Sequence, residues 1–103
     1  MFCLSETWFT EEVPNALLGL SNYHIFRQDR LGRMGGGVMI CTKMGLHVSQ
    51  IETPLSNCFE LVAIDLYVTN RTIRVVCAYF PPENAARGVR ELVQGLRALA
   101  YCW

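Results

Sequence analysis

The sequence predicts an α+β fold in which mostly antiparallel strands are followed by one C-terminal amphipathic helix. Residues 59–68 and 72–82 are apolar on nearly both faces, which is typical of strands inside a domain. From residue 84 onward the apolar period becomes helical, with a stripe formed by Ala85, Val89, Leu92, Leu96 and Leu99. This change of period predicts strands first and a helix last.

Residues 72–82 are expected to form the central strand of the domain. Pro81 and Pro82 cannot donate to a strand ladder, so the strand should end before them. Loops that follow central strands often present functional side chains, which makes Tyr79 a candidate functional residue. The alternative is a half-buried tyrosine whose hydroxyl finds a structural partner.

Four further segments are predicted to be strands: residues 2–4, 23–26, 38–41 and 46–51. The connections at 43–45 and 69–71 are short enough for hairpins, so the middle of the chain is predicted to be a meander. Residues 54–57 interrupt the strand pattern. A helical turn or two is expected after Thr10 as N-cap, with Gly19 at its end.

The bulk composition indicates a single globular domain inside the cell. The chain has 103 residues, and 51% of them are apolar while 17% are charged, which argues against disorder. Nine basic and nine acidic side chains cancel, so no overall field attracts nucleic acid or an anionic membrane. The first residues lack the features of a signal peptide, and no window resembles a membrane span. The expected location is therefore nuclear or cytoplasmic, neither secreted nor in a membrane.

The cysteines predict small buried hydrophobic side chains in a reducing compartment. There are five, an odd number without C-x-x-C spacing: Cys3, Cys41, Cys58, Cys77 and Cys102. A zinc site with His24 or His47 is the alternative, but it lacks the usual ligand spacing.

Two acidic residues are candidates for special roles. Glu6 follows the first strand, beside Trp8, and a carboxylate there is able to hold Mg²⁺, which takes one or two protein carboxylates besides phosphate and water. The alternative is a solvated loop acid. Asp65 lies in an apolar strand and therefore needs a partner. Arg74 across the hairpin is the expected one, although a metal-binding role for Asp65 stays open.

A basic loop precedes three consecutive glycines. Arg27, Arg30 and Arg33 have the chemistry to grip phosphates, but Asp29 dilutes their charge, and a merely soluble loop is the alternative. Residues 35–37 lack the Lys-Ser/Thr of a P-loop and lead into a strand. They are therefore expected to permit close backbone packing instead of cradling a phosphate.

Four motifs in series carry a resemblance: SETW at 5–8, YHIFRQDRLGRMGGGVMI at 23–40, FELVAIDL at 59–66 and IRVVCAYFPP at 73–82. Together they resemble the endonuclease domain of LINE-type (non-LTR) retrotransposons, a member of the exonuclease III-like endonuclease/exonuclease/phosphatase superfamily. The resemblance implies a four-layered α/β/β/α sandwich that nicks DNA with Mg²⁺ to prime reverse transcription. It also implies that Glu6 binds the metal and Tyr79 the scissile phosphate, with Arg30 and Arg33 in a family-like loop as candidate substrate-binding residues.

Other elements of the family site are missing from the sequence. These are the leading strand with its asparagine, the D-x-N strand and the terminal S-D-H. Residues 1–103 are therefore expected to form one partial domain, a fragment that is inactive alone. Two alternatives stay open: a non-catalytic remnant or interaction module of the same fold, and a phosphoesterase of the same superfamily. The sequence predicts neither the oligomeric state nor the DNA target.

Overall fold

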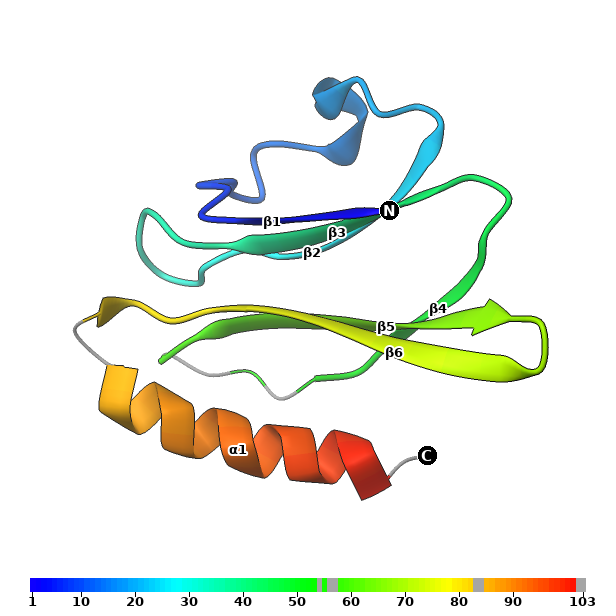
Figure 1. Ribbon diagram of the computed structural model, residues 1–103. Helices are drawn as coiled ribbons and strands as arrows, with labels where there is room; N and C mark the ends of the chain where they lie inside the picture. The colour runs from blue at the N-terminus through cyan, green and yellow to red at the C-terminus, as the bar shows by residue number, and fades with distance from the viewer. Residues whose placement is uncertain (54, 56–57, 83–84, 102–103) are drawn as a thin grey trace.

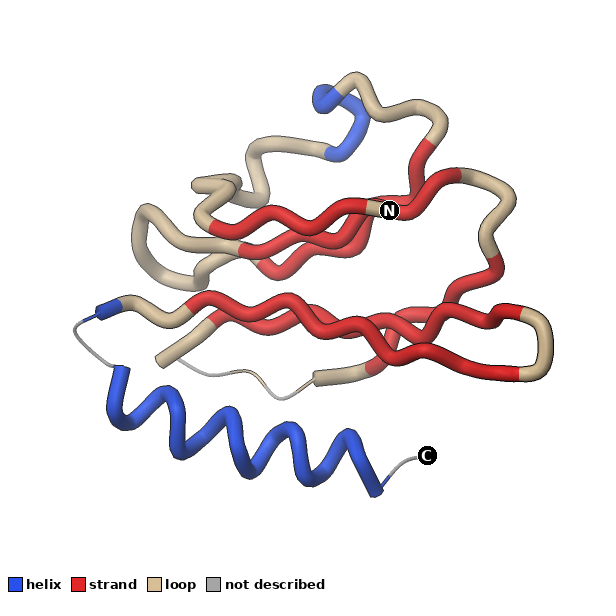
Figure 2. Tube along the Cα trace, in the orientation of Figure 1, coloured by secondary structure: helices blue, strands red, loops and turns tan. Residues whose placement is uncertain are grey.

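The chain folds into two facing antiparallel sheets with one helix packed outside, as a computed structural model of residues 1–53, 55, 58–82 and 85–101 shows. Helix α1 (Ala85–Tyr101) lies against the outer face of one sheet, and a long loop with the short 3₁₀ turn η1 (Asn15–Leu18) lies above the other (Figure 1). The predicted α+β class is confirmed. Over the sheet that α1 does not cover, the outer layer is this loop instead of a full helix (Figure 2).

The first sheet has the strand order β1-β3-β2. Its strands are β1 (Phe2–Ser5), β2 (Tyr23–Gln28) and β3 (Val38–Lys43). Ile40 of the central strand pairs with Cys3 on one side and with Phe26 on the other. Directly opposed residues point to the same face of a sheet, so these three side chains face the second sheet together.

The second sheet has the order β4-β5-β6. Its strands are β4 (His47–Ile51), β5 (Glu60–Val68) and β6 (Arg71–Tyr79). The central strand β5 is buried from Glu60 to Asp65, whereas β6 is mostly half-buried and lies at an edge of this sheet as described. The prediction that residues 72–82 form the central strand is therefore wrong: β5, equally apolar in sequence, takes the position between two neighbours.

The predicted meander is also wrong at one point. The turn at Met44–Gly45 does not fold β3 and β4 into a hairpin, because β3 is already flanked by β1 and β2. It carries the chain from one sheet to the other, where β4 pairs with β5. The predicted interruption of the strand pattern at residues 54–57 falls mostly outside the described part of the chain, which omits residues 54 and 56–57.

The main core lies between the sheets. Val38 and Ile40 of β3 meet Val62 and Ile64 of β5, and all four are at most 2% exposed. Half-buried side chains close this cluster from the neighbouring strands: Phe26, Val48, Val75, Cys77 and Tyr79. The two sheets are therefore joined mainly by aliphatic packing at their centres.

Helix α1 packs on the second sheet at one point of close approach. A Cβ on Gly88 would come within 2.7 Å of the Phe80 ring, and Leu92 packs against a second buried cluster that includes Phe59. Val89 and Leu96 are 51% and 40% exposed, so of these three members of the predicted apolar stripe only Leu92 lies on the packed face. The reason is that the helix approaches the sheet through the side lacking a side chain at Gly88.

The short helical turn begins later than predicted. Its N-cap is Pro14, not Thr10, since the residue before a proline is disfavoured in helical conformation. The Thr10 hydroxyl instead accepts a hydrogen bond from the Glu12 N–H at 3.3 Å. Gly19 ends the turn in the left-handed region at φ +68°, as predicted. No helix in the described ranges is long and apolar enough to cross a membrane.

Asp65 and Arg74 form the cross-strand pair that the sequence predicts. They are directly opposed on β5 and β6, and the guanidinium donates to both carboxylate oxygens, at 2.8 and 2.9 Å. These hydrogen bonds from Arg74 are the main reason that the pKa of Asp65 is lowered. A lowered pKa means that the pair stabilises the fold while the carboxylate is ionised.

Low pH should therefore destabilise the fold, in part by protonating the Asp65 carboxylate. The contribution is present above the ordinary aspartate pKa of about 3.9 and is lost as the pH falls toward the lower pKa of the folded state. In Asp65→Asn we expect lower stability at neutral pH and a flatter pH dependence below about pH 5. Urea midpoints measured across this range test it. The exposed acid Glu11, changed to Gln, serves as a control, and an unchanged acid slope in Asp65→Asn would refute the assignment.

Candidate active site

The ends of five strands meet at one end of the sandwich. Ser5 and Gln28 both pair with Val38, so β1 and β2 end where β3 begins. In the other sheet Glu60 pairs with Tyr79, so β5 begins where β6 ends. The loops at this end therefore bring together residues distant in sequence.

Glu6 and Tyr79, the two residues predicted to be catalytic, are in direct contact there. The Tyr79 hydroxyl donates a hydrogen bond of 2.7 Å to Glu6 Oε1, across 73 residues of sequence. This bond is the main reason that the pKa of Tyr79 is raised, so the hydroxyl stays protonated and able to donate. Glu6 itself is exposed and has a positive φ of 55°, a conformation that costs a non-glycine residue energy and often occurs at functional sites.

Arg30 joins this pair from the loop after β2. Its guanidinium carbon lies 5.9 Å from the centre of the Tyr79 ring, within the range of a cation–π contact. Its Nε lies 3.4 Å from Glu60 Oε1, forming an ion pair, and has no hydrogen-bond partner despite being buried. A largely buried cation with an unused N–H group therefore stands beside the tyrosine.

Glu60 is a site residue that sequence reasoning missed. Its side chain is only 6% exposed, and its Oε1 accepts a 2.6 Å hydrogen bond from the Gly37 N–H. The available signal was an acid at the start of an otherwise apolar strand, the same signal that drew attention to Asp65. Its partners Arg30 and Gly37 come from the loop between β2 and β3, and the sequence does not predict that this loop lies against β5.

The three glycines permit close packing, as predicted, and Gly36 lies directly against Glu60. All have positive φ, and a Cβ on Gly36 would collide with Glu60 Oε1 and with the Arg30 guanidinium. The Gly36 carbonyl accepts a 2.9 Å hydrogen bond from the Trp8 N–H, which ties this loop to the segment after Glu6. We name Glu6, Arg30, Glu60 and Tyr79 the strand-end cluster.

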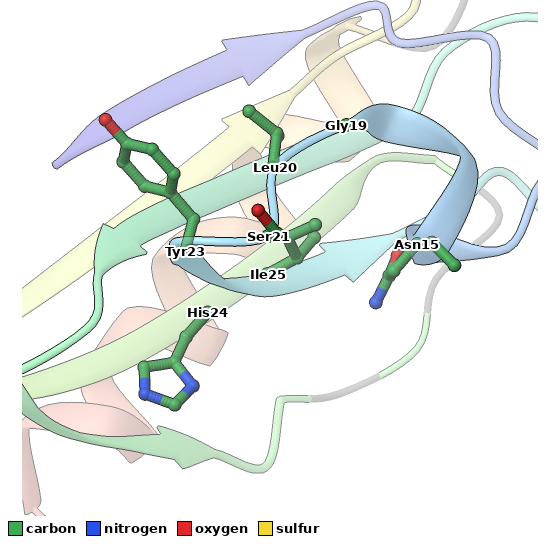
Figure 3. A pocket seen from close by; sticks show the side chains of 8 residues that line it. Asn15, Gly19, Leu20, Ser21, Tyr23, His24 and Ile25 are labelled. Carbon is green, nitrogen blue, oxygen red and sulfur yellow. The ribbon is translucent and has the colours of Figure 1, made fainter.

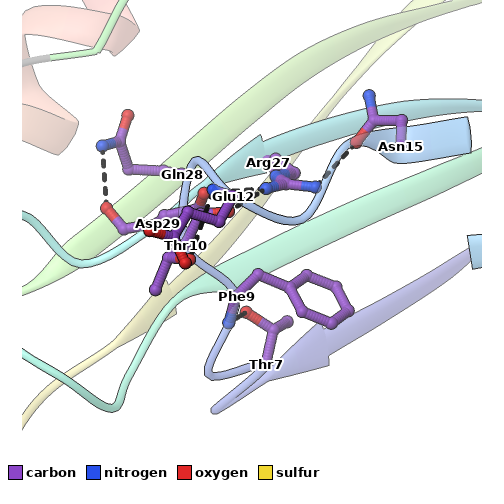
Figure 4. A network of polar contacts seen from close by, with 8 residues as sticks. All are labelled: Thr7, Phe9, Thr10, Glu12, Asn15, Arg27, Gln28 and Asp29. Carbon is purple, nitrogen blue, oxygen red and sulfur yellow. Dashed lines mark hydrogen bonds and ion pairs between the residues drawn. The ribbon is translucent and has the colours of Figure 1, made fainter. Parts of the chain in front are cut away.

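The other two arginines of the predicted basic loop differ from Arg30, and Arg27 lies in strand β2 instead of a loop. Arg33 is exposed in the same loop. Arg27 anchors the segment after Glu6, because its guanidinium donates to the Thr10 carbonyl, to Asn15 Oδ1 and to Asp29 Oδ2, each at 2.9 Å (Figure 4). Arg27 also lies over the Phe9 ring at 5.3 Å. These contacts indicate a structural role for Arg27.

A pocket of about 470 Å³ lies elsewhere, between η1 and β2. It is lined by Asn15, Ala16, Gly19, Leu20, Ser21, Tyr23, His24 and Ile25. Figure 3 shows Tyr23 and His24 pointing to opposite sides of the chain there. Glu6, Arg30, Arg33 and Tyr79, the predicted catalytic and substrate-binding residues, do not line this pocket.

Among the described residues, no group of three or more His, Cys, Asp or Glu side chains is placed to hold a metal ion. Compared with known proteins, the chain matches no family model, no curated protein and no solved structure. The strand-end cluster and the sequence motifs are therefore the features that point to a function.

Proposed function

We propose that the strand-end cluster binds the phosphate and the metal of a Mg²⁺-dependent DNA endonuclease site of the LINE retrotransposon type. The observation that supports this most is the Tyr79–Glu6 hydrogen bond with Arg30 over the tyrosine ring. It joins a candidate metal ligand, a neutral donor and a cation, and these are the groups that a phosphodiester requires.

The donor set suits a Mg²⁺ ion that shares its coordination with substrate. Mg²⁺ in proteins commonly takes one or two carboxylates and completes its shell with phosphate oxygens and water. Glu6 is exposed and supplies one such carboxylate, whereas Glu60 is buried and already engaged by Gly37 and Arg30. A bound Mg²⁺ would supply neutralisation of the phosphate's charge.

The remaining groups of the cluster would bind the phosphate and hold the charged groups around it in position. A tyrosine hydroxyl is protonated at neutral pH, so Tyr79 can donate its hydrogen bond to a phosphate oxygen in place of Glu6. Arg30 places its positive charge beside that hydroxyl, and Glu60 holds the guanidinium in position. None of these roles activates the attacking water, so we expect the cluster to bind phosphodiesters well and cleave them poorly.

DNA binding reported by Trp8 tests this proposal. Trp8 lies beside the cluster residue Arg30, because a Cβ on Gly35 would be 3.2 Å from the Arg30 guanidinium and 3.6 Å from the Trp8 ring. In a Trp103→Phe background Trp8 is the sole tryptophan of the chain. We expect a short DNA duplex to change its fluorescence in the presence of Mg²⁺, with clearly weaker binding after Mg²⁺ is chelated.

Three variants distinguish binding at the cluster from a general effect of charge on DNA binding. Glu6→Gln should abolish the Mg²⁺ dependence, and Tyr79→Phe should weaken binding about tenfold, as expected for one hydrogen bond of about 1.4 kcal/mol. Glu11→Gln removes the same charge from the nearby loop and should change neither. Equal losses in Glu6→Gln and Glu11→Gln would refute the proposal. In a parallel plasmid-nicking assay, cleavage that survives Glu6→Gln does not come from this site.

A further inference from the structure

Two cysteines from different sheets face each other beside the cluster. Cys3 is on β1 and Cys77 is on β6, and these two strands are in contact across the sandwich. The Cys77 thiol donates to the Leu4 carbonyl at 3.7 Å, which places its sulfur against the residue that follows Cys3. Both cysteines are free thiols.

The strand register independently turns Cys3 toward β6. Cys3 pairs with Ile40, a core residue facing the second sheet, so Cys3 points the same way. Cys77 packs against that core from the opposite side. Burial is the largest cause of the raised pKa of Cys77, and a nearby Cys3 thiol is the next. Cys41 pairs with Phe2 and lies on the other face of the first sheet.

We infer that Cys3 and Cys77 form a reversible disulfide that links the two sheets, with low-molecular-weight disulfides such as oxidised glutathione as the oxidant. Exposed Cys3 attacks first and gives a mixed disulfide, releasing one glutathione thiolate. Cys77 then attacks the Cys3 sulfur and releases the second thiolate. The two thiols lose two electrons and two protons, which reduce one glutathione disulfide to two glutathione molecules.

This bond would act on the strands that carry the strand-end cluster. Cys3 lies in β1, three residues before Glu6, and Cys77 and Tyr79 are two positions apart on β6. The disulfide therefore holds β1 against β6, whose ends make the Glu6–Tyr79 contact. In a reducing compartment it forms only under oxidative conditions. The inference stands whether or not the cluster binds phosphodiesters.

Disulfide mapping of the native chain tests the inference. The folded protein is equilibrated with rising ratios of oxidised to reduced glutathione, the remaining thiols are alkylated, and the crosslinked peptides are identified by mass spectrometry. We expect a Cys3–Cys77 peptide as the main intramolecular product. We also expect a higher urea midpoint for the oxidised chain, which reductant reverses and Cys3→Ser lacks.

A one-residue shift provides the matched control. In Cys3→Ser/Leu4→Cys the thiol moves to the opposite face of β1, because side chains alternate along a strand. This variant should give far less crosslink to Cys77. The inference is overturned if the shifted thiol crosslinks as well as Cys3 does. It is also overturned if the main disulfide involves another cysteine, or if Cys3 stops at the glutathione adduct.

Discussion

Replacing Gly36 with alanine is expected to lower the free energy of unfolding by about 3–5 kcal/mol, a large part of the total stability of a small domain. Gly36 has a φ of +63°, where an alanine costs about 1–2 kcal/mol for its conformation alone. The added Cβ would also collide with Glu60 Oε1 and with the Arg30 guanidinium. The new methyl group would therefore separate a buried ion pair.

Gly19→Ala is the matched control for this variant. Gly19 has nearly the same φ, +68°, but a Cβ there meets nothing within 4 Å. It should therefore cost only the conformational part, about 1–2 kcal/mol. Urea unfolding of both variants gives the difference, which isolates the collision with Glu60 and Arg30. Equal losses in the two variants would show that Gly36 is needed only for its backbone conformation.

Gly36→Ala should also affect binding at the strand-end cluster. Arg30 sits between the Tyr79 ring and Glu60, so displacing it removes positive charge from beside the tyrosine. We expect DNA binding reported by Trp8 to weaken in Gly36→Ala under conditions where the variant is still folded. Gly19→Ala should bind as the unchanged chain does.

Ile64→Ala is expected to destabilise the fold by about 2–5 kcal/mol. Ile64 is 0% exposed at the centre of the core between the sheets, where it packs with Val38, Ile40 and Val62. Truncation there leaves a cavity bounded by both sheets, which relaxes only partly. Because the sheets are joined mainly by this cluster, the loss should appear as cooperative unfolding at a lower urea concentration.

The same substitution at Ile73 provides the comparison. Ile73 lies on the neighbouring strand and is 42% exposed. Ile73→Ala should cost about 1 kcal/mol, because few contacts are lost and no closed cavity forms. A loss at Ile73 as large as at Ile64 would mean that the exposed end of β6 around Ile73 is packed in solution.

Local features of the fold could be predicted from the sequence because they depend on short-range chemistry. Strand and helix periods, the Gly19 turn end and the Asp65–Arg74 pair follow from side-chain alternation, backbone freedom and a turn two residues long. The functional candidates Glu6 and Tyr79 were identified from their motifs. The sequence alone predicted these two candidates and placed each of them at the end of a strand.

The tertiary structure decided which of these elements meet. β3 and β4 are joined by a short turn yet belong to different sheets, because β1 returns from the start of the chain to occupy the edge that a hairpin would use. Glu60 became a site residue only because Gly36 and Gly37 leave room for its carboxylate. Pairing between distant segments depends on competition among several apolar strands of similar composition, and local sequence does not determine which partner wins.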